Sequence, residues 1–165
     1  MTCRTCIKFR IWTRSRTTEN ITAWQARHRD VCDRYHHQNK VVPSLEDAIR
    51  LTGLRDGMTI SFHHHFRNGD HIVNMVLDKL AEMGFHDLKL AASSLSAIHA
   101  PLIRHIQNGV ITHIETSGMR GELAEAVSRG LMDCPVVFRS HGGRASAIRT
   151  GELHIDVAFL GAPSC

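Results

Sequence analysis

The feature that most constrains the fold is a regular alternation of short apolar segments with amphipathic ones, which begins at Pro43. Segments of helical character carry periodic apolar residues and have Ser, Pro or Gly at their ends. Such alternation is typical of βαβ crossovers. We therefore expect an α/β domain of three layers, Rossmann-like, with helices on both faces of a mostly parallel sheet. The expected strands are residues 58–62, 88–92, 112–116, 136–138 and 155–160.

Several residues mark the ends of the expected helices. Ser44 can cap a short helix, with Asp47 three residues on, and Gly53 can end it. Pro101 suits the first turn of a helix that runs through Gln107. The last helix is expected as a short turn over residues 144–150, after a Gly-Gly turn.

The charge is distributed unevenly and places a domain boundary near residue 41. Residues 1–40 hold nine Lys/Arg and three Asp/Glu, a net +6, whereas residues 41–165 hold eleven and thirteen, a net −2. The basic segment 1–40 is expected to be disordered or part-helical, and it could be a transit peptide, a solvated tail or an atypical start. The body, residues 41–165, lacks a basic stripe and has few aromatic residues, which disfavours nucleic-acid binding. No apolar run reaches the ~20 residues of a membrane span.

The cysteines and histidines do not form a recognisable metal motif. The five cysteines are spaced irregularly, and the single C-x-x-C, Cys3 to Cys6, has no second pair nearby. The run His63 to His65 has no acidic residue in its loop to complete a ligand set, since Asp70 is expected to cap a helix. We expect free thiols and no metal site.

Ligands of parallel α/β sheets bind where the strands end, so the loops after the strands are the candidate site. The loop 63–70 offers His63, the guanidinium of Arg67 and the close backbone approach that Gly69 allows. The loop 140–144 offers His141, Arg144 and the backbone N–H groups of Gly142 and Gly143, which suit a carboxylate or an oxyanion. Hydroxyl groups at Ser94 and Ser117 could donate to an anionic ligand, or could simply cap helices.

Five segments together resemble the alpha subunit of bacterial citrate lyase, which is the citrate CoA-transferase component. They are H-H-H-F-R-N-G-D within residues 56–76, S-S-L-S-A-I-H-A-P within 93–106, T-S-G-M-R-G-E-L within 116–131, H-G-G-R at 141–144, and G-E-L-H-I-D-V-A-F-L-G-A-P-S-C at 151–165. The resemblance runs from about residue 43 to residue 165. It implies a CoA-transferase-like fold, of which residues 41–165 are the first, C-terminally truncated domain.

The resemblance also implies an activity. Citrate would exchange with acetate on a thioester, giving a citryl thioester, and a separate beta subunit would cleave that product. The thioester would be a phosphoribosyl-dephospho-CoA group presented by the acyl-carrier gamma subunit, with no cofactor attached covalently to this chain. Arg67, Arg144 and His141, with His63, would anchor citrate. Gly69, Gly142, Gly143, Ser94 and Ser117 would serve the oxyanion or thioester, and no nucleophile is assigned.

The expected setting is a cytoplasmic, multi-subunit complex, in which the isolated chain would show little transferase activity because it lacks part of the site. The alternative is a non-catalytic Rossmann-like module that binds a partner subunit or a CoA-like ligand. Citrate binding distinguishes the two. The first interpretation requires Arg67, His141 and Arg144 to lie along one rim of the molecule.

Overall fold

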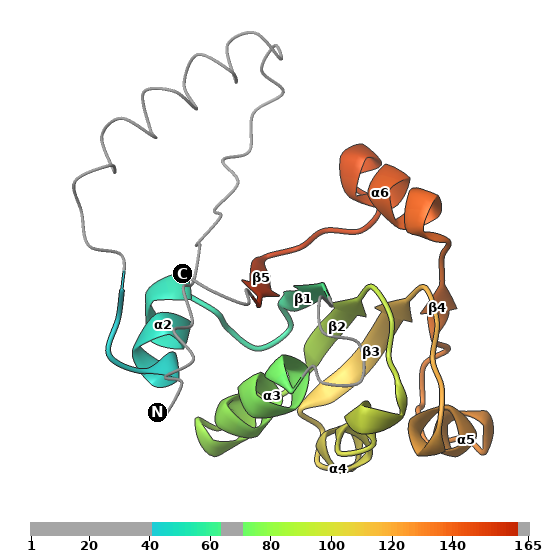
Figure 1. Ribbon diagram of the computed structural model, residues 1–165, viewed down its shortest axis with the longest axis horizontal. Helices are drawn as coiled ribbons and strands as arrows, with labels where there is room; N and C mark the ends of the chain where they lie inside the picture. Colours follow the sequence, from blue (N-terminus) through green and yellow to red (C-terminus); the bar gives the residue numbers. More distant parts are fainter. Residues whose placement is uncertain (1–40, 64–70, 162–165) are drawn as a thin grey trace, which may run out of the picture.

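The computed structural model describes residues 41–63 and 71–161. Within these residues the chain forms one five-stranded sheet, in which every neighbouring pair of strands is parallel (Figure 1). The strand order is β4-β3-β2-β1-β5, so the last strand returns to lie beside the first. The strands are β1 (Thr59–His63), β2 (Leu88–Ala92), β3 (Ile111–Thr116), β4 (Val137–Phe138) and β5 (Val157–Leu160).

Helices lie on both faces of the sheet, which confirms the three-layer α/β fold (Figure 1). One face, here called the first face, is covered by the larger group: α3 (Ile72–Glu82), the short 3-10 helix η2 (Ala97–His99), α4 (Leu102–Gln107) and α5 (Glu122–Ser128). Helix α2 (Leu45–Thr52) packs beside α3. The opposite, second face carries α6 (His141–Thr150), which lies in the connection from β4 back to β5.

The two faces differ in chemistry because successive strand residues point to opposite sides. Side chains such as Ile60, Phe62 and Leu90 enter the large core of the first face. Phe62 also stacks on Phe159 of β5, with ring centroids 5.4 Å apart. The second face instead presents one row of small or polar residues across three strands: Ser61, Ala91 and Glu115, which are register partners. The helices on both faces were predicted, but this polar row was not.

Local signals positioned most elements well. Ser44 caps α2 by accepting a hydrogen bond from the Asp47 N–H at 3.0 Å, and Gly53 ends the helix in a left-handed conformation with φ of 68°. The prediction for β2 matches the observed strand, and β4 is one residue shorter than expected.

The main local correction concerns the last helix. Residues 141–143 were expected as a Gly-Gly turn, but α6 begins at His141. The physical reason is that Ser140 caps the helix, its Oγ accepting from the Gly143 N–H at 3.0 Å. A cap of this kind is worth about 1 kcal/mol, which offsets the low helix propensity of one glycine.

Some sequence predictions fall outside the described residues. They include the segment 1–40 with Cys3 and Cys6, the helix cap Asp70, and the site residues Arg67 and Gly69. Among the helices that are described, none is both long and apolar enough to cross a membrane.

Candidate functional site

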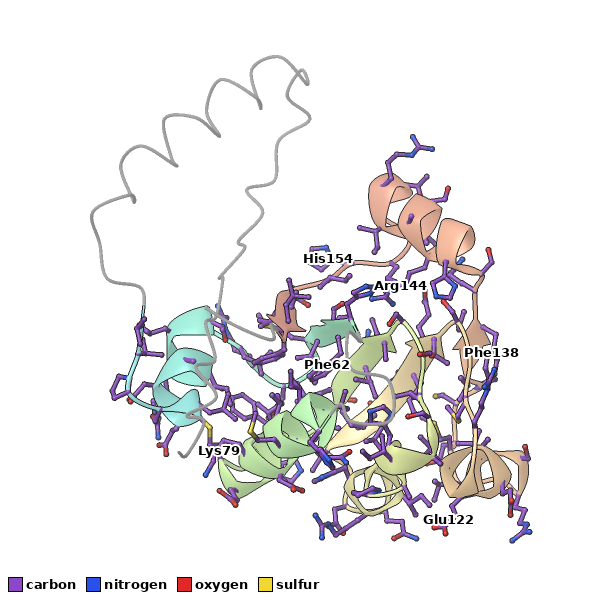
Figure 2. All side chains as sticks on the ribbon, viewed as in Figure 1. Phe62, Lys79, Glu122, Phe138, Arg144 and His154 are labelled. Atoms are coloured by element: carbon purple, nitrogen blue, oxygen red, sulfur yellow. The ribbon has the colours of Figure 1, made fainter. Side chains whose placement is uncertain are left out.

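The centre of the candidate site is Arg144, in the first turn of α6. Its side chain reaches from the helix onto the second face of the sheet, toward β1 and β2 (Figure 2). Nη2 donates to Ser61 Oγ at 2.9 Å and to the Ala91 carbonyl at 3.1 Å. Arg144 therefore connects three segments that are far apart in the sequence, and its guanidinium is held over the middle of the sheet.

The charge of Arg144 has no carboxylate partner within the described residues. Both of its hydrogen-bond acceptors are neutral, and its Nη1 is buried without a partner in that part of the chain. Burial lowers the pKa of the Arg144 guanidinium, while the nearby Glu115 carboxylate acts in the opposite direction. Arginine stays protonated at neutral pH even so. A buried donor without an acceptor costs about 1–3 kcal/mol, so an anion that reached Nη1 would recover that energy.

A second arginine near Arg144 differs from it by forming ion pairs with two carboxylates. Arg139 follows β4, and its Nε donates to Glu115 Oε1 at 2.7 Å while its Nη2 donates to Glu152 Oε1 at 2.6 Å. These hydrogen bonds, the one to Glu152 first, raise the pKa of Arg139. The sequence analysis did not single out Ser61, Arg139 or a pairing role for Glu115. The one available signal was the alternation within Thr59–His63, which places Ser61 on the opposite face from Ile60 and Phe62.

The first turn of α6 places His141, Gly142 and Gly143 next to Arg144. His141 and Gly142 are exposed. The Gly143 N–H is already bonded to Ser140, so it is not the free donor that was expected. The N–H groups of His141 and Gly142 belong to the helix start, where no helical carbonyl can accept from them. Of the predicted Gly-Gly donors, Gly142 thus keeps this possibility and Gly143 does not.

Three further predicted residues lie at the ends of β1, β2 and β3. His63 is the last residue of β1 and is exposed, on the same face as Ser61 because the two are separated by two positions. Ser94 is exposed just after β2. Ser117, just after β3, has a buried Oγ with no hydrogen-bond partner within the described residues. The structure therefore brings His141 and Arg144 onto one helical turn and His63 onto the same sheet face, whereas Arg67 and Gly69 stay untested.

The loops after β2 and β3 are fixed to one another. Leu95 N–H donates to the Gly118 carbonyl at 2.8 Å, and Arg120 N–H donates to the Leu95 carbonyl at 2.9 Å. Leu95 and Met119 thereby form a parallel bridge beyond the sheet. This pairing holds the backbone around Ser94 and Ser117 in place at the carboxyl ends of β2 and β3.

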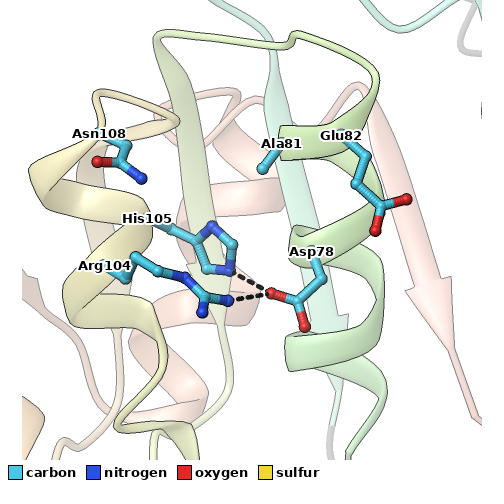
Figure 3. A pocket seen from close by; sticks show the side chains of 6 residues that line it. All are labelled: Asp78, Ala81, Glu82, Arg104, His105 and Asn108. Atoms are coloured by element: carbon cyan, nitrogen blue, oxygen red, sulfur yellow. Dashed lines mark hydrogen bonds and ion pairs between the residues drawn. The ribbon is translucent and has the colours of Figure 1, made fainter.

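A pocket elsewhere in the molecule belongs to helix packing (Figure 3). It lies between α3 and α4, on the first face, so the sheet separates it from Arg144. Arg104 Nη2 and His105 Nε2 both bond to Asp78 Oδ1, at 2.7 and 2.9 Å. No sequence-predicted site residue lines this pocket. In the described part of the chain, no His, Cys, Asp or Glu side chains are grouped to hold a metal ion.

Comparison with known proteins decides the family. The family model described as citrate lyase, alpha subunit, matches residues 38–165. The chain belongs to the citrate lyase alpha subunit family. Its relatives include the citrate lyase alpha chains of Escherichia coli, 53% identical over 92% of this chain, and of Klebsiella pneumoniae, 64% identical over 78% of this chain.

A solved structure of a citrate lyase alpha subunit has the same fold. It is the protein from Streptococcus mutans, crystallised in complex with citrate, with a TM-score of 0.76 and 44% identity over 99% of this chain. The chain covers 28% of that structure's length. It likewise spans 32% and 25% of the E. coli and K. pneumoniae citrate lyase alpha chains.

Proposed function

We propose that this chain forms a citrate-binding part of a citrate CoA-transferase subunit of citrate lyase. In the proposed reaction citrate and an acetyl thioester give a citryl thioester and acetate. Family membership supports this proposal, and so does the citrate complex of the S. mutans alpha subunit. Because the chain spans 25–32% of its curated relatives, the exchange is proposed for the whole subunit, to which this chain contributes binding groups.

The observation that carries the proposal is the set of hydrogen-bond partners of Arg144. Its guanidinium is fixed by Ser61 and Ala91, carries no ion pair within residues 41–63 and 71–161, and has an unpartnered Nη1. The two N–H groups of Nη1 are the donors left for a ligand, and hydrogen bonds from a charged guanidinium to a carboxylate are charge-assisted and therefore strong. His141, one helical turn away, and His63 would add donors for the other carboxylates of citrate.

The thioester and the partners follow from the same proposal. The acetyl and citryl groups would be carried on a phosphoribosyl-dephospho-CoA arm of the acyl-carrier gamma subunit, and the beta subunit would cleave the citryl product. This chain would present hydrogen-bond donors to the thioester carbonyl. Ser117 Oγ is the strongest candidate, because it is buried near the strand ends with its hydrogen-bonding capacity unused in the described residues.

Calorimetric titration of the purified 165-residue chain with citrate tests the proposal. Arg144→Gln removes the charge, and its shorter side chain also gives up the hydrogen bonds of Nη2 to Ser61 and Ala91. Charge-assisted hydrogen bonds contribute about 1.5–3 kcal/mol, so we expect citrate affinity to fall roughly 10- to 150-fold.

Arg149→Gln is the matched control, since it removes an exposed arginine from the last turn of the same helix and should leave affinity unchanged. Failure of the unsubstituted chain to bind citrate, or equal affinity of the Arg144→Gln variant, contradicts the proposal.

A further inference from the structure

Two arginines and one carboxylate meet on the second face of the sheet. Glu115 of β3 is the register partner of Ala91 in β2, and the Ala91 carbonyl accepts from Arg144. Adjacent strands are separated by about 4.8 Å, so Glu115 lies within short electrostatic range of Arg144. Glu115 also acts on Arg144 through space, although the two form no ion pair.

The Glu115 carboxylate is instead bonded to Arg139. Arg139 Nε lies 2.7 Å from Glu115 Oε1, and both side chains are largely buried, with exposed fractions of 23% and 17%. The other arm of Arg139 bonds to Glu152, whose side chain is 62% exposed. One guanidinium thus bonds to two carboxylates, whereas the neighbouring guanidinium of Arg144 bonds only to neutral acceptors within the described residues.

From this division of charge we propose that Arg139 is a positioning residue for the anion site. By engaging Glu115, it prevents that carboxylate from pairing with Arg144, so that Arg144 keeps its charge and donors for an anionic ligand. The ligand-binding part of this inference rests on the proposed function, in which the anion is citrate. Arg139 itself does not touch the ligand.

Three variants of the 165-residue chain separate this role from a merely structural one in citrate titrations. Arg139→Gln frees Glu115 to pair with Arg144, and we expect citrate affinity to fall on the order of 10-fold, as for coupled groups in one network. Adding Glu115→Gln to that variant removes the competing carboxylate and should restore affinity to within about 2-fold. Glu152→Gln breaks the other arm of Arg139 but leaves Glu115 engaged, so it should bind citrate like the unsubstituted chain.

The inference is overturned if R139Q binds citrate as tightly as the parent chain, if E152Q weakens binding as much as R139Q, or if R139Q/E115Q fails to recover. Recovery through loss of a second charge is a result that a simple packing defect would not give.

A second measurement needs no ligand. The coupling between Glu115 and Arg144 is obtained from the unfolding of E115Q, R144Q and the double variant, once with Arg139 present and once in the R139Q background. We expect a larger coupling in the R139Q background, and equal coupling in both backgrounds refutes the inference. If the parent chain does not bind citrate, the proposed function fails, while this cycle still decides whether Arg139 withholds Glu115 from Arg144.

Discussion

The substitution Gly121→Ala should test how tightly the loops after β2 and β3 pack against each other. It precedes α5 with φ of 71° and ψ of −157°, a conformation that is essentially restricted to glycine. A Cβ at this position would lie 2.9 Å from both Cα and Cβ of Ala97 in η2. Ala97 cannot move away easily, because the paired loops around Leu95 and Met119 fix both segments.

The magnitude follows from two separate costs in Gly121→Ala. The unfavourable backbone conformation contributes roughly 1–3 kcal/mol, and the overlap with Ala97 adds about 1–3 kcal/mol of overpacking. We expect the free energy of unfolding to fall by roughly 2–6 kcal/mol, measured by urea denaturation followed by circular dichroism.

Two other glycines serve as comparisons, one with the backbone strain alone and one with neither cost. Gly130 has φ of +91° but nothing within 4 Å of an added Cβ, so Gly130→Ala should show conformational strain alone, about 1–2 kcal/mol. Gly118 has neither a positive φ nor a close neighbour, so Gly118→Ala should change stability by less than about 0.5 kcal/mol. A Gly121→Ala variant no less stable than Gly130→Ala would show that the Ala97 contact is not tight, and the reasoning would be refuted.

Two further predictions concern α6 and the α3–α4 contact. Ser140→Ala and Ser44→Ala each remove a cap with a 3.0 Å bond and should each cost about 1 kcal/mol in urea denaturation. Only Ser140→Ala should weaken citrate binding in calorimetry, because it loosens the turn that carries Arg144; equal citrate affinity in the two variants would contradict this.

The His105 side chain is 2% exposed, and its Nδ1 has no hydrogen-bond partner among the described residues. Burial lowers the pKa of His105, although the hydrogen bond to the Asp78 carboxylate acts in the opposite direction. The unfolded chain therefore takes up a proton below about pH 6.5 that the folded chain resists, so stability should fall as pH drops below that value. The slope is at most about 1.4 kcal/mol per pH unit for this one group. His105→Gln should remove that part of the slope in urea denaturation, and an unchanged slope would contradict the assignment.

Much of the fold could be predicted because its signals are local. Ser44 and Gly53 mark the two ends of α2 through side-chain and backbone geometry that depends only on near neighbours. The apolar run 88–92 is observed as β2. The prediction failed locally at residues 141–143, where the weak helix propensity of the Gly-Gly pair was weighed and the cap at Ser140 was not.

The sequence predicted some residues of the candidate site but not the contacts between them. Arg144 was identified as an anion anchor from its loop, but its partners Ser61 and Ala91 lie 83 and 53 residues away in the sequence. Whether its charge is free depends on Arg139 occupying Glu115, which lies 24 residues from Arg139. The sequence shows that Arg139, Arg144 and Glu115 are present, but it does not show which arginine pairs with the carboxylate.

The sequence by itself determined the alternation of strands and helices, the two ends of α2 and the family, because each depends on residues adjacent in the chain or on motifs read in order. Only the tertiary structure decided that β5 lies beside β1, that the second face carries a polar row, and which arginine forms the ion pairs with Glu115 and Glu152. The physical reason is that ion pairing and burial are set by distances between segments that the chain brings together only on folding.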